Sequence, residues 1–374
     1  MKYNSLILHN GNEIDPHTGA LSIPIYQAST YHQFDIDNPG QYDYSRSGNP
    51  TRAALENTVA VLEGGLKAFA FSSGMAATSS VLAMFQQGDH LVVAEDIYGG
   101  TYRALTKLFN NFGITVTFVN TNILSSISQA IGPNTKALFL ESPSNPLLKV
   151  TDIKGAVQLA KKHGLITIID NTFMSPYFQR PLELGVDISI HSATKFLGGH
   201  SDVIGGIVVT ASEELAKKVY FVQNCFGAVL GPQDCWLILR GIKTLRARME
   251  MQQQSTLAIA QWLTAQSWVK QVYYPGLPDH PGHSLLKEQA YGFGCVVSFE
   301  TATVELAKKI MTKTKLWSVA VSLGGVESIL SYPVKMSHAA IPPAERARLG
   351  ISDALIRLSV GLEEAGDLME DLIP

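Results

Sequence analysis

The chain has 374 residues, of which 46% are hydrophobic and 16% are charged, and its formal net charge is −3. This composition excludes a disordered chain and is typical of a globular protein of two or three domains. The slight acidic balance gives no basis for binding nucleic acid or an anionic membrane, and no run approaches the roughly 18 apolar residues of a transmembrane helix.

The N-terminal segment, residues 1–48, is rich in Pro, Gly and Tyr and shows little periodicity. A segment of this kind seldom packs on itself, so we expect it to be an arm that lies on a neighbouring subunit. From Asn49 onward, helical patterns alternate with short apolar, β-branched runs, which predicts a large domain over residues 49–245.

The large domain has a regular alternation of predicted elements. Apolar spacing predicts helices over residues 51–62, 75–86, 101–112 and 154–163. Buried strands are predicted over residues 90–94, 114–119, 137–140, 165–169, 187–190 and 203–210. This order predicts an α/β fold with a mostly parallel sheet covered on both faces, in which ligands bind at the carboxyl ends of the strands.

A long helical pattern over residues 232–266 leads out of the large domain. The remainder is predicted to form a smaller α+β domain over residues 246–374. It contains predicted strands at 296–299 and 356–360 and a predicted helix at 303–311.

Lys195 follows the strand predicted over residues 187–190 and therefore lies at the carboxyl edge of the sheet. A lone lysine in such a loop is usually a solvated surface residue. Here the hydroxyl residues Ser192 and Thr194 can donate to a phosphate, and the two glycines that follow allow the backbone to approach a ligand closely. An amine beside a phosphate site is what covalent attachment of pyridoxal 5'-phosphate (PLP) requires.

Two other features of the predicted sheet edge suit the same cofactor. Asp170 ends the strand at 165–169, where a carboxylate could pair with the pyridine nitrogen of PLP and keep it protonated; an ordinary loop acid is the alternative. The small-residue turn Phe71–Ala77 opens a helix, whose first amides suit a phosphate. Many helices begin in this way, so the turn alone is a weak signal.

Tyr98 and Arg357 are candidates for the remaining parts of the site. Tyr98 follows the strand at 90–94 and could stack on a flat ring, although such a tyrosine more often belongs to the core. Arg357 lies in an apolar strand, where an arginine is costly unless it is paired. Its planar fork suits the carboxylate of an amino-acid substrate, and the alternative is a structural ion pair with Glu363 or Glu364.

Together these segments resemble the PLP-dependent cysteine and methionine metabolism family, which includes the cystathionine lyases and synthases and methionine γ-lyase. The resemblance spans essentially the whole chain and implies the PLP-dependent transferase-like fold of type I, with a mostly parallel seven-stranded sheet in the large domain. Seven segments occur in the family's order: Tyr44–Thr51, Ser73–Ala76, Tyr98–Thr101, Glu141–Pro146, Asp170–Phe173, His191–His200 and Ser322–Ser328.

The resemblance also implies roles for individual residues. Lys195 would hold PLP and then move protons, and Tyr98 would stack on the ring and assist proton transfer. Ser322 and Arg357 would hold the substrate carboxylate, beside Val321. The family typically forms a homotetramer of dimers that share active sites. The other implied cofactor-binding residues are Asp170 at the pyridine nitrogen, Asn145 at the ring hydroxyl, Gly74, Met75, Ser192 and Thr194 at the phosphate, Tyr44 and Arg46 at the phosphate of a neighbouring subunit, and Thr172.

Within the family, Tyr42–Arg52 and Gly231–Leu237 most resemble the cystathionine lyases. We expect γ-elimination of L-cystathionine to cysteine, 2-oxobutyrate and ammonia, ahead of β-elimination to homocysteine, pyruvate and ammonia. Val321 stands where many γ-lyases carry Glu. It would remove an anchor for the distal ammonium and broaden the substrates toward homocysteine, cysteine or methionine.

Two related activities have less support in the sequence. Cystathionine γ-synthase stays open, because it runs the same γ-chemistry on an activated homoserine. Methionine γ-lyase is less favoured, because the stretch Tyr98–Phe112 contains no cysteine.

Other classes of protein fit the sequence poorly. No Gly-x-Gly-x-x-Gly follows an early strand, which argues against a nicotinamide oxidoreductase. His191, His200 and His283 lack helical His-x-x-x-His spacing, so we expect no metal site. A catalytically inactive binding protein is disfavoured because both Lys195 and Asp170 are intact.

The cysteine content and the N-terminus bear on the compartment. Cys225, Cys235 and Cys295 are odd in number and lack metal-ligand spacing, so we expect reduced thiols. The first residues lack the apolar run of a signal peptide. We therefore expect a cytoplasmic enzyme that acts on a small amino acid.

Overall fold

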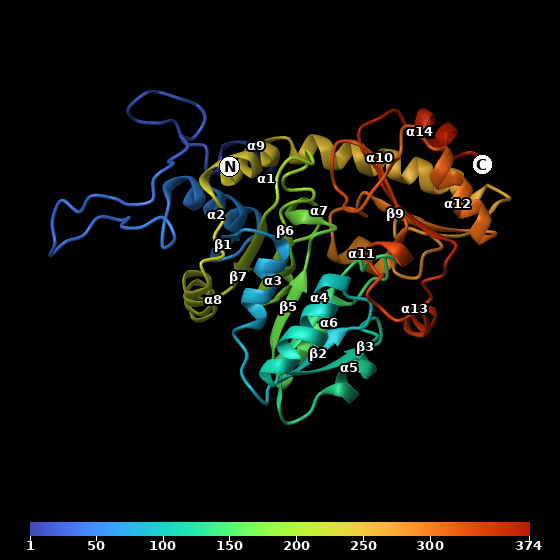
Figure 1. Ribbon diagram of the computed structural model, residues 1–374, viewed down its shortest axis with the longest axis horizontal. Coiled ribbons are helices and arrows are strands. Elements are labelled where there is room, and N and C mark those ends of the chain that lie inside the picture. Colours follow the sequence, from blue (N-terminus) through green and yellow to red (C-terminus); the bar gives the residue numbers. More distant parts are fainter.

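The computed structural model describes all 374 residues. After a short N-terminal helix, α1 (Tyr3–His9), the chain builds a large domain and then a small domain (Figure 1). The helices of the large domain are α2 (Pro50–Glu63), α3 (Gly74–Leu82), α4 (Gly99–Arg103), α5 (Leu124–Ala130), α6 (Ile153–Lys162), α7 (Ser175–Phe178), α8 (Glu213–Phe226) and α9 (Pro232–Lys243). Its strands are β1 (Lys67–Phe71), β2 (His90–Ala94), β3 (Thr115–Val119), β4 (Thr135–Glu141), β5 (Ile166–Asp170), β6 (Ile188–Ser192) and β7 (Gly206–Thr210).

The strands of the large domain form one seven-stranded sheet in the order β1-β7-β6-β5-β4-β2-β3. Only β7 runs antiparallel to its neighbours, so the expectation of a mostly parallel sheet is confirmed. Apolar side chains of α3 and α8 pack on one face, and those of α2, α6 and α9 pack on the other. The sheet is thus covered on both sides, which leaves its carboxyl edge as the place where polar loops converge.

The small domain is an α+β unit, as expected. Its sheet has the order β10-β11-β12-β9-β8 and is antiparallel except where β10 pairs with β11. Helices α10, α12 and α14 pack on it around a core that includes Trp317 and Phe299. The elements are α10 (Leu245–Thr264), β8 (Val269–Tyr273), α11 (His283–Gln289), β9 (Val296–Thr301), α12 (Val304–Lys313), β10 (Ser318–Val319), β11 (Ile329–Ser331), α13 (Pro343–Leu349), β12 (Leu355–Ser359) and α14 (Ala365–Leu372).

Several predicted boundaries differ from the structure. The helix expected over 75–86 ends at Leu82, because the amide of Gln86 bonds to the Asp89 carboxylate in a turn. The helix expected over 101–112 is α4 followed by a π-helical segment (Ala104–Leu108) and a 3-10 turn (Phe109–Phe112). The pattern over 232–266 is two helices that meet at Thr244.

Strand β1 was not expected from the sequence, whereas β7 is shorter than expected. The five residues of β1, Lys-Ala-Phe-Ala-Phe, carry little β-branched signal, and the strand forms because it pairs with β7 at the edge of the sheet. Strand β7 begins at Gly206 and not at residue 203. A Cβ at Gly206 would overlap the backbone oxygen of Ser73, so this glycine lets β7 approach the start of α3.

The first residues of the N-terminal segment do not belong to the arm that was expected. Helix α1 packs on its own chain, with Ile7 buried, and the Tyr3 hydroxyl donates to the backbone oxygens of Leu62 (3.1 Å) and Pro176 (2.6 Å). The following residues, 10–48, contain no helix or strand and extend away from the large domain (Figure 1). None of the helices is both long enough and apolar enough to span a membrane.

Candidate active site

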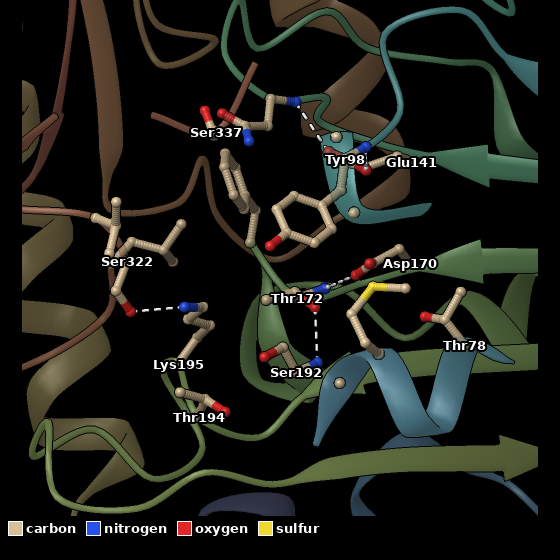
Figure 2. Close-up of a pocket in the computed structure, with 18 of the residues that line it drawn as sticks. Thr78, Tyr98, Glu141, Asp170, Thr172, Ser192, Thr194, Lys195, Ser322 and Ser337 are labelled. Carbon is tan, nitrogen blue, oxygen red and sulfur yellow. Dashed lines mark hydrogen bonds between the residues drawn. The ribbon is translucent and has the colours of Figure 1, made fainter. Parts of the chain in front are cut away.

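A cavity of about 470 Å³ opens at the carboxyl edge of the large sheet and is closed on the other side by the small domain. Loops from strands β2, β4, β5 and β6 meet residues of the small domain there (Figure 2). Of the residues named from the sequence, the cavity is lined by Gly74, Met75, Tyr98, Asn145, Asp170, Thr172, Ser192, Thr194, Lys195, Val321, Ser322 and Arg357. Tyr44 and Arg46 are not among the lining residues.

Lys195 lies in the loop after β6, and its amine points into the cavity (Figure 2). The Nζ atom donates to the Ser322 hydroxyl at 2.6 Å and makes no ion pair. Burial, and then the positive charge of Arg357, lower the pKa of Lys195 to about 8. The lysine is therefore available as a neutral amine near physiological pH, which a nucleophile or a base requires.

Ser322 connects Lys195 to Arg357. Its hydroxyl accepts from Lys195, and its backbone oxygen accepts from Arg357 Nη2 at 2.7 Å. The residue has φ +88°, in the left-handed region that favours glycine. Backbone strain of this kind persists only where the surroundings over-determine the conformation, and it is concentrated at functional sites.

Asp170 is the last residue of β5, as expected. Its Oδ1 accepts from the amide of Thr172 at 3.0 Å, and the Thr172 hydroxyl in turn accepts from the amide of Ser192 at 2.9 Å. Burial raises the pKa of Asp170, while Thr172 lowers it. The second carboxylate oxygen has no hydrogen-bond partner in the chain, so it is free for a cationic ligand atom.

The start of α3 forms a cradle of donors. Ser73 caps the helix by accepting from the amide of Ala76 at 3.0 Å, whereas the amides of Gly74 and Met75 have no acceptor within the chain. A Cβ at Gly74 would lie 2.8 Å from Ser192 Cβ, so only glycine allows this close approach. Free amides at a helix start, together with nearby hydroxyl groups, are the donor set that a phosphate needs.

Thr194 lines the same part of the cavity, but its hydroxyl is engaged elsewhere. It donates to the backbone oxygen of Gly205 at 3.2 Å and accepts from the amide of that residue at 3.1 Å. In this conformation Ser192 has the free hydroxyl, and Thr194 joins two loops.

Tyr98 immediately precedes α4, is 40% exposed and lines the cavity. The hydroxyl makes no hydrogen bond in the chain and points into the space that the Lys195 amine also faces (Figure 2). A side chain on Gly99 would overlap the backbone oxygen of Ser337, and one on Gly100 would overlap the Tyr98 ring. Because Tyr98 is exposed to the cavity, the alternative that it is a core residue is wrong.

Arg357, on β12, is only 3% exposed, yet it has no carboxylate partner. It donates to Asn145 Oδ1 (3.0 Å), to the Ser322 backbone oxygen (2.7 Å) and to Ser331 Oγ (3.2 Å). The expected alternative of an ion pair with Glu363 or Glu364 is wrong, because Arg357 makes no ion pair, and Glu363 accepts from Ser328 instead. Burial lowers the pKa of Arg357 to about 10. A buried cation without an anion is suited to bind one.

Tyr44 and Arg46 lie outside the cavity of their own chain. Arg46 donates to the backbone oxygen and the side-chain oxygen of Asn224, at 2.7 and 3.1 Å, and its guanidinium lies 5.5 Å from the ring centre of Tyr44. Both residues belong to the extended N-terminal segment, so their position leaves them accessible to a neighbouring subunit.

The lining residues to which the sequence assigned no role include Arg103, Glu141 and Ser337. Glu141 could have been found, because it is a charged residue directly after an apolar strand, like Asp170. Arg103 is an exposed residue at the end of α4, and nothing in its local sequence distinguishes it from a solvated arginine. Ser337 reaches the cavity only because the small domain folds over it.

The residues of this cavity fit PLP as a set. One amine can bond an aldehyde, one free carboxylate oxygen can pair with a protonated ring nitrogen, a helix start can hold a phosphate, and an aromatic ring can cover a flat heterocycle. Each of these groups comes from a different loop at the same sheet edge.

The chain is similar in sequence to known enzymes of sulfur amino acids. A sequence model of the family described as Cys/Met metabolism PLP-dependent enzyme matches residues 4–373. Cystathionine beta-lyase MetC of Bacillus subtilis (strain 168) is 55% identical over 365 residues, which are 98% of this chain and 94% of the relative. Cystathionine gamma-lyase of the same strain is 53% identical over 372 residues, which are 100% and 98% of the two chains.

The fold is similar as well. The crystal structure of cystathionine gamma-lyase from Lactobacillus plantarum complexed with L-serine superposes with a TM-score of 0.97 at 48% identity, covering 100% of this chain and 97% of that one. Two relatives of nearly equal identity thus carry the names of different reactions, and similarity alone does not separate them.

Proposed function

The chain belongs to the PLP-dependent enzymes of cysteine and methionine metabolism and is a carbon–sulfur lyase, and we propose that it cleaves L-cystathionine by γ-elimination. The products are cysteine, 2-oxobutyrate and ammonia. One observation carries this choice: two proton-transferring groups face the same space, the amine of Lys195 for the protons of Cα and Cβ and the unpaired hydroxyl of Tyr98 for the leaving sulfur. γ-Elimination removes protons from both Cα and Cβ, whereas β-elimination removes only the first.

Arg357 binds the α-carboxylate of the substrate in this proposal. Its guanidinium fork is held by Asn145, Ser322 and Ser331, and each of these contacts leaves the arginine charge uncompensated. When bound at Lys195, PLP supplies a protonated ring that stores the electron pair released at Cα. Asp170 keeps the ring nitrogen protonated through its free oxygen.

Lys195 then acts as the base. As a neutral amine it would take the proton from Cα and, once it had given that proton up to the bound cofactor, would take a second proton from Cβ after a small shift of its four-carbon side chain. The hydrogen bond from Nζ to Ser322 orients the amine within the cavity. Tyr98 assists by donating a proton to the leaving sulfur.

The distal end of the substrate extends toward Val321 and Arg103 at the rim of the cavity. Arg103 can attract the second carboxylate of cystathionine. Val321 is 64% exposed and offers no charge to the distal ammonium. We expect homocysteine and cysteine, which lack the long distal group, to be slower substrates of the same site.

A β-elimination that yields homocysteine, pyruvate and ammonia is the second candidate. It is favoured by the 55% identity to a protein named cystathionine beta-lyase. In this route the Lys195 amine removes a proton from Cα and none from Cβ.

Product analysis separates the two routes. Purified enzyme with bound PLP should release 2-oxobutyrate and cysteine from L-cystathionine in equal amounts, measured by chromatography of the oxo acids and by a thiol assay. Pyruvate with homocysteine in excess would reject the γ route and support the β route. Failure to cleave cystathionine, with formation of cystathionine from cysteine and an acylated homoserine, would reject both.

The low pKa of Lys195 predicts how cofactor capture depends on pH. Only the neutral amine attacks the aldehyde of PLP, and with a pKa of about 8 roughly a tenth of Lys195 is neutral at pH 7. Protein freed of PLP should recapture it at a rate that rises with pH and levels off above about 8, followed by absorbance. Nα-acetyl-lysine, with a pKa of about 10.4, is the control and should still accelerate at pH 9 to 10. A protein rate that follows the control would contradict this assignment.

The assembly and location are also proposals. Phe34 and Ile36, in the extended N-terminal segment, are 94% and 91% exposed, which is unfavourable unless another subunit covers them. We propose a cytoplasmic homotetramer of dimers, in which Tyr44 and Arg46 reach the phosphate bound in the neighbouring subunit.

A further inference from the structure

Glu141 is a buried carboxylate for which the reaction above gives no role. It is the last residue of β4 and pairs in register with Asp170, the last residue of β5. Burial, and then the charge of Asp170, raise the pKa of Glu141 well above its usual value. A second acid beside the cofactor's carboxylate is unfavourable, so its presence calls for a specific use.

Both oxygens of Glu141 are engaged by backbone amides of two different loops. Oε2 accepts from the amide of Tyr98 at 2.8 Å, and Oε1 accepts from the amide of Asn145 at 3.0 Å. The first loop follows β2, and the second follows β4 itself. One side chain therefore holds two loops at defined positions on the sheet edge (Figure 2).

Each of these loops carries one part of the site. The first places the ring of Tyr98 in the cavity, directly before the glycines that the packing requires. The second places Asn145, whose side-chain oxygen accepts from Arg357 Nη1 at 3.0 Å. Glu141 is thus connected to Arg357 through one residue, Asn145, and to the Tyr98 ring through the backbone amide of Tyr98.

We propose that Glu141 is a positioning residue, which sets the ring of Tyr98 and, through Asn145, the guanidinium of Arg357. The proposal rests on the function proposed above for these two residues. Glu141 acts through them, because its own oxygens are occupied by the two amides.

Asp96 offers a matched control. It is also a buried acid, and it joins the same two loops, since it accepts from Ser144 Oγ at 2.5 Å and lies 3.8 Å from Lys149 Nζ. It bonds neither Tyr98 nor Asn145, and it does not line the cavity. A general loss of loop stability should therefore affect Asp96 and Glu141 variants alike, whereas positioning should affect only the latter.

The test uses Glu141→Gln and Asp96→Asn in the enzyme with PLP bound. Gln has one oxygen and one NH₂ group, so one of the two amides must face a donor instead of an acceptor. We expect E141Q to change the visible circular dichroism of the bound cofactor, because the stacked ring shifts. Glycine serves as the test ligand, because it has an α-carboxylate and no leaving group, and its half-saturation concentration should rise about tenfold in E141Q.

The control variant D96N should behave differently. It should lower the unfolding temperature but leave the dichroism and the glycine titration within about twofold of the parent, the scatter usual for such effects.

Two further variants make the test more specific. Glu141→Asp keeps the charge but withdraws both oxygens, so it should weaken glycine binding in the same direction, and it replaces E141Q if the latter does not fold. Asn145→Ala added to E141Q should raise the half-saturation concentration by less than it does alone, because the two residues lie on one path. If the effects of the two substitutions on the half-saturation concentration were fully additive, Glu141 would not act on Arg357 through Asn145.

An unchanged glycine titration and dichroism in E141Q, or equal changes in D96N, would overturn the proposal. Cleavage of cystathionine is measured separately. A parent enzyme that binds glycine but does not cleave cystathionine would reject the proposed reaction. The comparison of E141Q with D96N would still test whether Glu141 positions Tyr98 and Arg357.

Discussion

Replacing Lys195 with alanine is expected to lower the turnover of cystathionine by about 10⁴-fold, the upper range for loss of a general acid–base group. Lys195 is the only amine that lines the cavity, and its pKa of about 8 suits it for proton removal. Borohydride treatment of the parent should fix the cofactor to the peptide that contains Lys195, as detected by mass spectrometry. The alanine variant should show no such adduct.

Lys195→Arg is the control for loss of charge. It keeps a cation beside Ser322, but a guanidinium stays protonated at any practical pH, so it should be as inactive as the alanine variant. Unfolding temperatures of both variants without PLP should stay close to that of the parent. Retention of a tenth of the parent turnover in either variant would show that another group removes the α-proton.

Arg357→Lys is expected to lower kcat/KM by about 10²- to 10³-fold, the range for loss of one partner of a buried charged pair. A lysine keeps the positive charge, but a single ammonium cannot bind the two oxygens of a carboxylate in parallel or hold Asn145, Ser322 and Ser331 together. Most of the loss should appear in KM, and glycine should bind correspondingly more weakly.

Arg248→Lys provides the matched comparison. Arg248 is another buried arginine, and it donates to the backbone oxygens of Phe196 and Gly241, each at 2.8 Å, without lining the cavity. Its replacement should lower the unfolding temperature and change KM little. Equal increases of KM in the two variants would mean that Arg357 supports the fold and does not bind the substrate carboxylate.

The order of strands and helices explains why much of the site could be predicted. Lys195, Asp170 and Tyr98 each follow a predicted apolar strand, and the carboxyl ends of parallel strands meet at one edge. Their convergence therefore follows from local patterns and one rule of topology. The same reasoning could have reached Glu141, since it ends β4 beside Asp170, but a single acid after a strand is a weak local signal.

The failures have local causes. The Lys-Ala-Phe-Ala-Phe run of β1 becomes a strand only through pairing with β7, 135 residues or more away in the chain. The N-terminal segment has too little periodicity to reveal that α1 packs on its own domain while the rest extends outward.

The sequence by itself determined the fold class, the order of the elements, and, through its resemblance, the family and the cofactor, because these depend on short-range periodicity and on contiguous motifs. Only the tertiary structure decided what surrounds the reactive lysine. The hydrogen bond from Lys195 to Ser322 joins residues 127 positions apart, and Arg357 lowers the lysine pKa from another domain. Such contacts depend on how the small domain packs against the sheet edge, and this packing is a sum of many weak interactions that no local pattern encodes.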